Sequence, residues 1–159
     1  MKITVLGCGT SFGVPMIACD CRVCRSDDPR NKRMRSSILV SANGKNILVD
    51  TTTDLRQQSI ANDIRHIDAV LYTHPHAEHL NGIDELRRFN IVQGTGIPCY
   101  GSPDTLEEIR QIFRYIFLRQ GRPGWQPDLS TNPVTGPFEL FGVPITPIPL
   151  IHGRMPVYG

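Results

Sequence analysis

The sequence predicts a mixed α/β (α+β) fold, and three observations indicate it. Short β-branched, apolar runs at residues 2–6, 37–41 and 67–72 have the composition of strands. Residues 102–118 instead carry apolar side chains at helical spacing. Segments of both kinds alternate along the 159 residues without a repeat or a linker. We therefore expect residues 1–159 to form a single domain, which is long enough to bury a core.

The first strand, residues 2–6, runs into a glycine-rich loop. Residues 37–41 and 46–50 predict two further strands. The Asn43-Gly44 pair between them tolerates positive φ, so the two strands are expected to form a hairpin.

The middle of the chain predicts a short helix at 54–61, a strand at 67–72 and a helix at 81–88. A strand at 97–101 is expected to lead into a longer helix, 102–118.

Ser102 is expected to cap that longer helix, with Pro103 in its first turn. Residues 120–137 are rich in glycine and proline and predict an irregular loop. Residues 138–141 and 144–150 predict a final pair of strands.

Charge and hydropathy argue against several classes of protein. Lys and Arg total 17 against 15 Asp and Glu, and a net charge of +2 does not indicate a nucleic-acid or membrane surface. No apolar run reaches the ~18 residues of a membrane span, and the first residues do not resemble a signal peptide. We therefore expect a cytoplasmic protein with neither nucleic acid nor membrane as its partner.

Three of the five histidines lie within six residues. His74 and His76 are two apart just after a predicted strand, so both side chains can point the same way. His79 follows where the chain bends toward a helix. Converging imidazole nitrogens suit a divalent ion such as zinc. The alternative is a polar loop with hydrogen-bonded histidines, which is more typical of a lone histidine, so we predict a metal site.

The motif HPHAEH, residues 74–79, resembles the signature of hydrolases with the metallo-β-lactamase fold. Other stretches agree with it: GCGTSFGVP, CDCRVC, DPRNKRMRSS, NILVD ending at Asp50, and PIPLIHG with His152. Together they resemble the branch that holds the cyclic ribosyl phosphate phosphodiesterase of phosphonate breakdown.

The resemblance implies an αββα sandwich, of which this chain supplies the N-terminal half to two-thirds. It implies a first metal site made of His74, His76 and His152, and a second that includes Glu78 and His79. The expected cofactors are one or two Zn²⁺ or Mn²⁺ ions, which can activate water for attack on a phosphodiester. Glu78 is the expected catalytic residue that also orients the nucleophile.

Asp50, the second expected catalytic residue, has two open interpretations. It supports the metal site through hydrogen bonds, or it caps nearby backbone amides as a buried carboxylate.

Two departures from the family pattern bear on the second metal site. The family normally has aspartate where this chain has Glu78, and the extra methylene moves the carboxylate by more than the ~0.2 Å that metal bonds tolerate. The family also has a bridging aspartate and a further histidine beyond the position of His152. We therefore expect the chain to be an N-terminal piece with an incomplete second site.

Cys19, Cys21 and Cys24 offer three thiolates, one short of the four that a structural Zn²⁺ takes. The resemblance implies that a histidine from a later region completes this site. The alternative is three idle or buried thiols. We expect Cys8 and Cys99, both in strand-like contexts, to be small core residues.

The expected function is metal-dependent hydrolysis of a small cyclic or sugar phosphate. The alternatives are hydrolysis of thioesters or lactones, and a catalytically incomplete metal-binding fragment. The basic residues at 30–35 either form a solvated loop or contact phosphate. A half-sandwich exposes an apolar sheet face, so we also expect a homo-oligomer.

Overall fold

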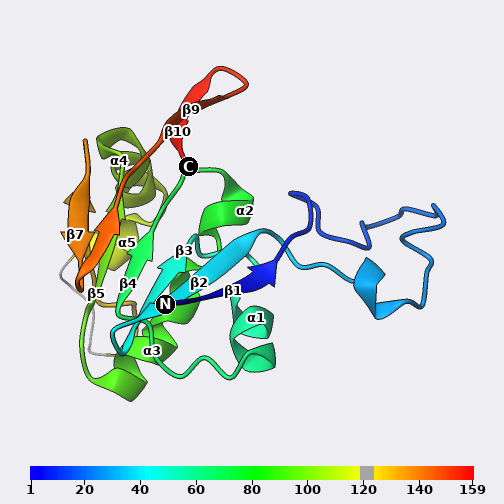
Figure 1. Cartoon of the computed structure of the whole chain (residues 1–159), viewed down its shortest axis with the longest axis horizontal. Coiled ribbons are helices and arrows are strands. Elements are labelled where there is room, and N and C mark those ends of the chain that lie inside the picture. The colour runs from blue at the N-terminus through cyan, green and yellow to red at the C-terminus, as the bar shows by residue number, and fades with distance from the viewer. Residues whose placement is uncertain (119–123) are drawn as a thin grey trace.

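The computed structural model describes residues 1–118 and 124–159 and contains a six-stranded sheet (Figure 1). In order across the sheet its strands are β1 (Lys2–Gly7), β2 (Ser37–Ala42), β3 (Lys45–Val49), β4 (Ala69–Leu71), β5 (Ile97–Gly101) and β6 (Leu129–Pro133). The first three strands run antiparallel, and β3 to β6 run parallel. The predicted α/β class is confirmed, as is the hairpin of β2 and β3.

Helices cover one face of this sheet (Figure 1). They are α1 (Leu55–Ala61), α2 (Ala77–Leu80), α3 (Leu86–Gln93), α4 (Pro103–Ile112) and α5 (Arg114–Phe117), with the 3₁₀ turn η2 (Ile83–Glu85). A further 3₁₀ turn, η1 (Pro29–Asn31), lies away from the sheet. Leu48, Val70 and Cys99 point from the strands into this layer and are at most 1% exposed. Burial of such side chains is the main favourable term in folding.

The helix predicted at 102–118 is divided in the structure. Its start is as expected, since the Ser102 hydroxyl accepts a hydrogen bond from the Thr105 N–H and Pro103 occupies the first turn. Phe113, however, has φ −105° and ψ 40°, which ends α4 before α5 begins. Phe113 packs against the core, so a tertiary contact interrupts a helix that the local pattern favours.

The prediction of an irregular loop at 120–137 is wrong for part of that range. Residues 120–123 lie outside the described part of the chain, but Leu129–Pro133 form β6, which pairs in parallel with β5. β6 is an edge strand, so its sequence LSTNP lacks the apolar pattern of a buried strand.

The strand predicted at 144–150 is also divided. Its first residues belong to β8 (Val143–Ile145), which pairs with β7 (Phe138–Leu140). Its last residues begin β9 (Pro149–His152), which pairs with an unpredicted strand, β10 (Met155–Tyr158). Pro147 has no N–H to continue a ladder, and Gly153, at φ +64°, permits the turn between β9 and β10.

The second face of the sheet is only partly covered. The β7–β8 hairpin packs over Ile47 and Ala69. Nearer the β1 edge, Ile3 and Val5 are 57% and 62% exposed. The open apolar face expected of a half-sandwich is therefore present.

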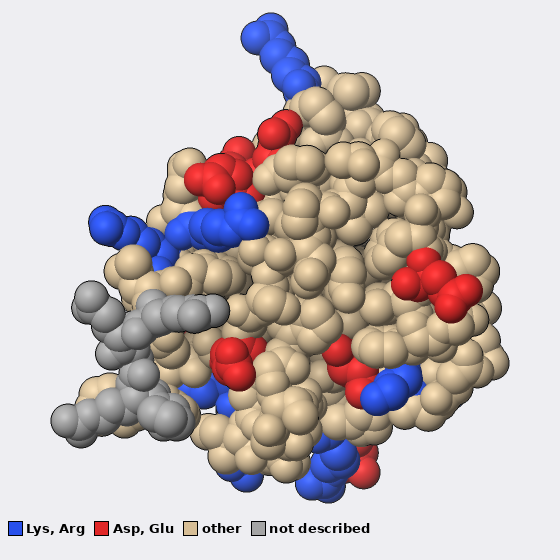
Figure 2. Space-filling view, turned by 90° about the vertical axis from the view of Figure 1, so that its left-hand side faces the viewer, with Lys and Arg blue, Asp and Glu red and all other residues tan. Residues whose placement is uncertain are grey.

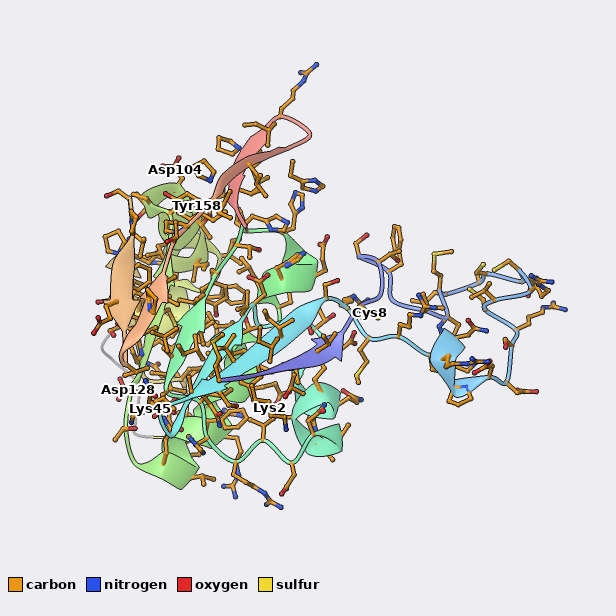
Figure 3. The ribbon with its side chains drawn as sticks, viewed as in Figure 1. Lys2, Cys8, Lys45, Asp104, Asp128 and Tyr158 are labelled. Atoms are coloured by element: carbon orange, nitrogen blue, oxygen red, sulfur yellow. The ribbon has the colours of Figure 1, made fainter. Side chains whose placement is uncertain are left out.

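Residues 8–36 leave the sheet after β1 and extend as an arm before returning at β2 (Figures 1 and 3). Cys8 lies at the base of this arm and is exposed, so its prediction as a core residue is wrong. The strand ends at Gly7, one residue too early for Cys8 to share the buried positions of β1. Cys99, on central strand β5, is buried as predicted.

The surface matches the balanced charge of the sequence. On the face shown in Figure 2, basic and acidic side chains lie in small groups of both signs. Within the described residues, every helix is too short or too polar to cross a membrane.

Candidate metal centre

The fold brings together three of the predicted ligands, His74, His76 and His152, which form a group that can hold a metal ion. One ligand atom from each lies within 4.8 Å of the others. Tetrahedral zinc, with bonds of 2.0–2.1 Å, places its nitrogens roughly 3.3 Å apart, so the widest separation in the group has to shorten by up to about 1.5 Å to bind it. His74 is buried, whereas His76 is half-buried and His152 is exposed, which leaves the last two rings room to move.

The β9–β10 hairpin carries His152 to this site. The Tyr158 N–H on β10 donates to the Thr73 carbonyl (3.0 Å), next to His74. His152 lies opposite Met155 in the hairpin ladder. The late histidine is therefore positioned by backbone hydrogen bonds to the loop that carries the early ones.

Hydrogen bonds define which nitrogen of His74 is free. The Thr73 hydroxyl donates to Asp50 Oδ2 (2.8 Å) and lies 2.9 Å from His74 Nδ1. Since a hydroxyl has only one hydrogen, its contact with His74 requires Nδ1 to be the donor. The lone pair of the neutral ring is then on Nε2, where it can bind a metal.

Asp50 orients His79 in the same way. Its Oδ2 lies 2.7 Å from His79 Nδ1, and a carboxylate only accepts, so Nδ1 donates and Nε2 is left free. Asp50 also accepts from the Thr73 N–H at 2.9 Å. The structure contains the contacts of both interpretations, because Asp50 caps a backbone amide and also accepts from the side chains of Thr73 and His79. Its role in catalysis stays a prediction.

The imidazoles of His74, which is buried, and His79, which is half-buried, have opposite pKa shifts. Burial, aided by the nearby His79, lowers the pKa of His74 to about 4, so the ring is neutral at pH 7 as a metal ligand must be. Burial also acts to lower the pKa of His79, but the hydrogen bond and charge of Asp50, with Glu78, outweigh it and raise that pKa above its usual value.

An open cleft of about 820 Å³ borders the histidines. Glu78 and His79 line it, and Glu78 Oε1 lies 4.0 Å from His76 Nδ1. Their predicted binding of a second ion stays a prediction, because among the described residues they are not part of the close group formed by the other three histidines. No lysine or arginine of the described chain lines this cleft.

The basic run of the arm is engaged elsewhere. Arg30 is paired with Asp28 at 2.7 Å, and its side chain is 87% exposed. Arg35 is paired with Asp54 at 2.9 Å and donates to the Ser11 carbonyl, which ties the arm to the start of α1. These contacts favour the solvated-loop interpretation of this run.

Cys19, Cys21 and Cys24 converge on the arm, with their sulfurs within 4.8 Å of one another. The Cys24 N–H donates to Cys21 Sγ (3.4 Å), and this bond, with hydrogen bonds from the other two thiols, lowers the pKa of Cys21 to about 7. Thiolates are the form that binds zinc, so the donor set suits the predicted ion. These three cysteines supply three of the four donors that a structural Zn²⁺ takes.

Thr73 and Tyr158 complete the site and were not predicted from the sequence. Thr73 directly precedes His74, so a hydroxyl beside a candidate ligand was the available signal. Tyr158 gave none, because its contact with Thr73 joins distant parts of the chain.

Comparison with known proteins identifies the family. A model described as the beta-lactamase superfamily domain matches residues 45–158. The chain belongs to this superfamily. The metallo-β-lactamase resemblance seen in the sequence is therefore confirmed.

The similar proteins are longer than this chain. A crystal structure described as a new diphosphatase from the PhnP family is 40% identical and has a TM-score of 0.88, over 99% of this chain and 60% of that one. A protein named octanoyltransferase from Porphyromonas gingivalis is 40% identical over 100% of this chain and 32% of its own length. The chain thus spans about a third of one relative and three-fifths of the other.

One solved structure with this fold is described as bound to Zn²⁺. A Zn²⁺-bound PqqB from Methylobacterium extorquens, 24% identical, has a TM-score of 0.75 over 100% of this chain and 58% of that one. At this identity the likeness is one of fold.

Proposed function

We propose that the chain is a metal-dependent phosphodiesterase that acts on a small cyclic or sugar phosphate. The observation that carries the proposal is the convergence of His74, His76 and His152 beside an open cleft in a chain of this superfamily. The 40% identity to a PhnP-family diphosphatase supports phosphate as the chemical class of the substrate.

In this proposal His74, His76 and His152 hold the first ion, which is Zn²⁺ or Mn²⁺. Glu78 and His79 bind the second, and Asp50 fixes the orientation of His79 and, through Thr73, of His74. Bound ions of this kind lower the pKa of water and neutralise charge on a phosphoryl group.

The cleft explains why the ions are needed for binding as well as for chemistry. Among the described residues its lining includes no lysine or arginine, so we expect bound metal to be the main cationic partner of a phosphate. One wall, at Ile38, Val49 and Leu150, is apolar and suits a sugar face or a base. We therefore expect activity to depend strictly on metal.

The test is hydrolysis of bis-(p-nitrophenyl) phosphate with added Zn²⁺ or Mn²⁺. His76→Ala removes a proposed metal ligand and should reduce the rate of hydrolysis by more than roughly 10–100-fold, which is the usual effect of removing a residue that only hydrogen-bonds to a ligand. His66→Ala is the matched control, because His66 lies outside the cleft against Asn46 and Asp68. EDTA should abolish the activity of the wild-type chain.

Other results would favour the alternatives. Zinc binding without hydrolysis of any phosphodiester supports the incomplete metal-binding fragment. Turnover of thioesters or lactones instead supports a different bond specificity. Hydrolysis of a diphosphate, the reaction class of the 40% identical relative, is a second candidate and belongs in the same assay.

We further propose a structural Zn²⁺ at Cys19, Cys21 and Cys24. Elemental analysis should find zinc that His76→Ala retains and Cys21→Ser loses. Three freely titrating thiols in a zinc-free wild-type chain would overturn this site. None of the five cysteines forms a disulfide in the structure, which supports a reducing, cytoplasmic location.

A further inference from the structure

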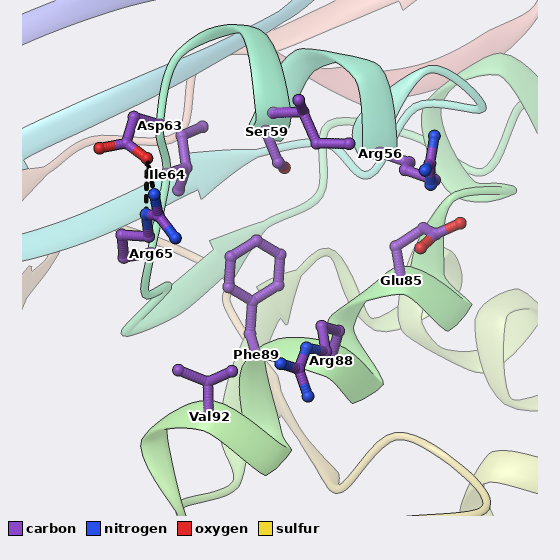
Figure 4. Close-up of a pocket in the computed structure, with 10 residues that line it drawn as sticks. Arg56, Ser59, Asp63, Ile64, Arg65, Glu85, Arg88, Phe89 and Val92 are labelled. Carbon is purple, nitrogen blue, oxygen red and sulfur yellow. Dashed lines mark hydrogen bonds and ion pairs between the residues drawn. The ribbon is translucent and has the colours of Figure 1, made fainter.

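A second cavity lies on the helical side of the molecule, between α1 and α3 (Figure 4). Its volume is about 400 Å³, which lies within the range of small-molecule sites. Phe89 and Ile64 form an apolar floor, and charged side chains form the rim. It shares no lining residue with the cleft of the metal centre. We call it the α1–α3 groove.

Ser59, on α1, places an unpaired hydroxyl in this groove. The residue is 9% exposed, and its Oγ is a buried oxygen without a hydrogen-bond partner in the described chain. A serine inside a helix can bond back to the carbonyl one turn earlier, but Ser59 does not. A buried polar group without a partner is costly, so an occupant that supplies one would remove this cost.

The rim carries more positive than negative charge. Arg65 is paired with Asp63, and Figure 4 shows this pair on one side of Phe89. On the other side lie Arg56, Arg88 and Glu85, for which no ion pair occurs within the described residues.

The two arginines without an ion pair in the described residues give this part of the rim a net positive charge, because only one such carboxylate, Glu85, lies with them. Their guanidinium groups match the oxygens of a carboxylate or phosphate. Arg88 and Phe89 are neighbours on α3 and both line the groove, so a ligand that packs on the Phe89 ring lies close to a cationic side chain (Figure 4).

We propose that the α1–α3 groove binds a small organic anion, an apolar ring or short chain that bears one carboxylate or phosphate. The apolar part packs on Phe89 and Ile64, the anionic group binds Arg88 and Arg56, and the Ser59 hydroxyl bonds to a polar atom of the ligand. The proposal does not depend on the metal centre or on its activity.

The test is an NMR titration of the ¹⁵N-labelled, metal-free chain with 1-naphthoate and with 1-naphthyl phosphate. Saturable shifts confined to α1 and α3 are expected, and the tighter of the two probes identifies the anionic group. Arg56→Gln/Arg88→Gln should weaken binding about tenfold or more, since it removes both charged partners. Arg114→Gln is the control, because this exposed arginine on α5 does not line the groove.

Ser59→Ala provides a second, independent readout. It should weaken binding about threefold to tenfold while the melting temperature is kept or raised, because the variant loses an unpaired hydroxyl. A lower melting temperature would mean that the hydroxyl already has a partner, and would overturn its assignment to a ligand.

The site as a whole is overturned by any of three results. These are shifts that map to the metal cleft instead, no saturation up to tens of millimolar of either probe, and equal binding by the double arginine variant. Should that variant fail to fold, the single variants Arg56→Gln and Arg88→Gln carry the same test.

Discussion

Asp50 accepts hydrogen bonds from the Thr73 N–H, the Thr73 hydroxyl and His79 Nδ1, although its own φ is +62°. Aspartate and asparagine are among the residues that tolerate this left-handed conformation. One side chain thus joins the end of β3 to the loop that carries the histidines. The sequence motif locates the histidines, while Asp50 determines which nitrogens they present.

Asp50→Asn tests this role, since asparagine keeps the shape and the backbone preference but removes the charge. We expect the pKa of His79 to fall, because the Asp50 charge helps to raise it, and zinc affinity to fall about 10–100-fold. NMR titration and calorimetry measure these changes. Asp104→Asn, at an exposed position on α4, should alter neither, and unchanged zinc affinity in Asp50→Asn would contradict the assignment.

The pKa of His74 predicts how the stability of the metal-free chain depends on pH. Its folded-state pKa is about 4 against 6.5 for an unperturbed histidine, so below pH 6.5 the unfolded chain binds this proton first. The His74 contribution to stability is therefore complete above about pH 6.5 and is lost as the pH falls toward 4.

His79 acts in the opposite direction, since its pKa is raised. The stability it contributes is present below its unfolded pKa and is lost as the pH rises through its folded pKa.

The His74 prediction is tested by chemical denaturation in EDTA, which should show a smaller loss of stability between pH 6.5 and 4 for His74→Gln than for the wild type. A His74 ring that titrates near 6.5 by NMR would refute this account.

At the scale of elements, the ligands depend on how α2 is anchored to the sheet. The Gly82 N–H, just after α2, donates to the Thr51 carbonyl at 2.9 Å. A Cβ at Gly82 would overlap the backbone oxygen of Thr52. This close approach holds the short helix with Glu78 and His79 next to the end of β3.

Gly82→Ala should therefore destabilise the fold by about 1–3 kcal/mol, the usual cost of overpacking. Urea denaturation measures the loss, and zinc affinity should fall with it because α2 is displaced. Gly136→Ala is the control, since a Cβ there meets nothing within 4 Å. Equal stability of the two variants would show that the approach of α2 is not constrained.

At the scale of the whole molecule, part of one sheet face is exposed and apolar. Ile3 and Val5 are on the edge strand β1 and pair with Val40 and Ile38 of β2. The edge therefore combines exposed apolar side chains with backbone groups that have no neighbouring strand. We propose that a second copy of the chain covers this face. We also retain the proposal that residues 1–159 form one metallo-β-lactamase-like domain, incomplete relative to the PhnP-family structure, of which the chain spans 60%.

Size-exclusion chromatography with light scattering tests self-association. The wild-type chain should be larger than a monomer at micromolar concentration, and Ile3→Thr/Val5→Thr should shift it to the monomer while keeping strand propensity. Ile112→Thr, at a 56% exposed position on α4, should leave the oligomer intact. A compact wild-type monomer would exclude a second copy as the occupant.

The sequence by itself determined those features that local patterns encode. Strand β1, the β2–β3 hairpin and the Ser102 cap follow from composition, turn residues and helix spacing over a few positions. His74, His76 and the three clustered cysteines could be assigned to metal sites because their ligands are close in sequence, and a motif resemblance added His152.

Only the tertiary structure decided what depends on contacts between distant residues. Pairing with β5 makes a strand of LSTNP, packing of Phe113 divides a helix, and Tyr158 brings His152 to Thr73. The hydroxyl of Thr73 and the carboxylate of Asp50 select the free nitrogens of two imidazoles. The physical reason is that a local pattern specifies which face of an element is apolar, whereas the partner of that face is set by the packing of the whole chain.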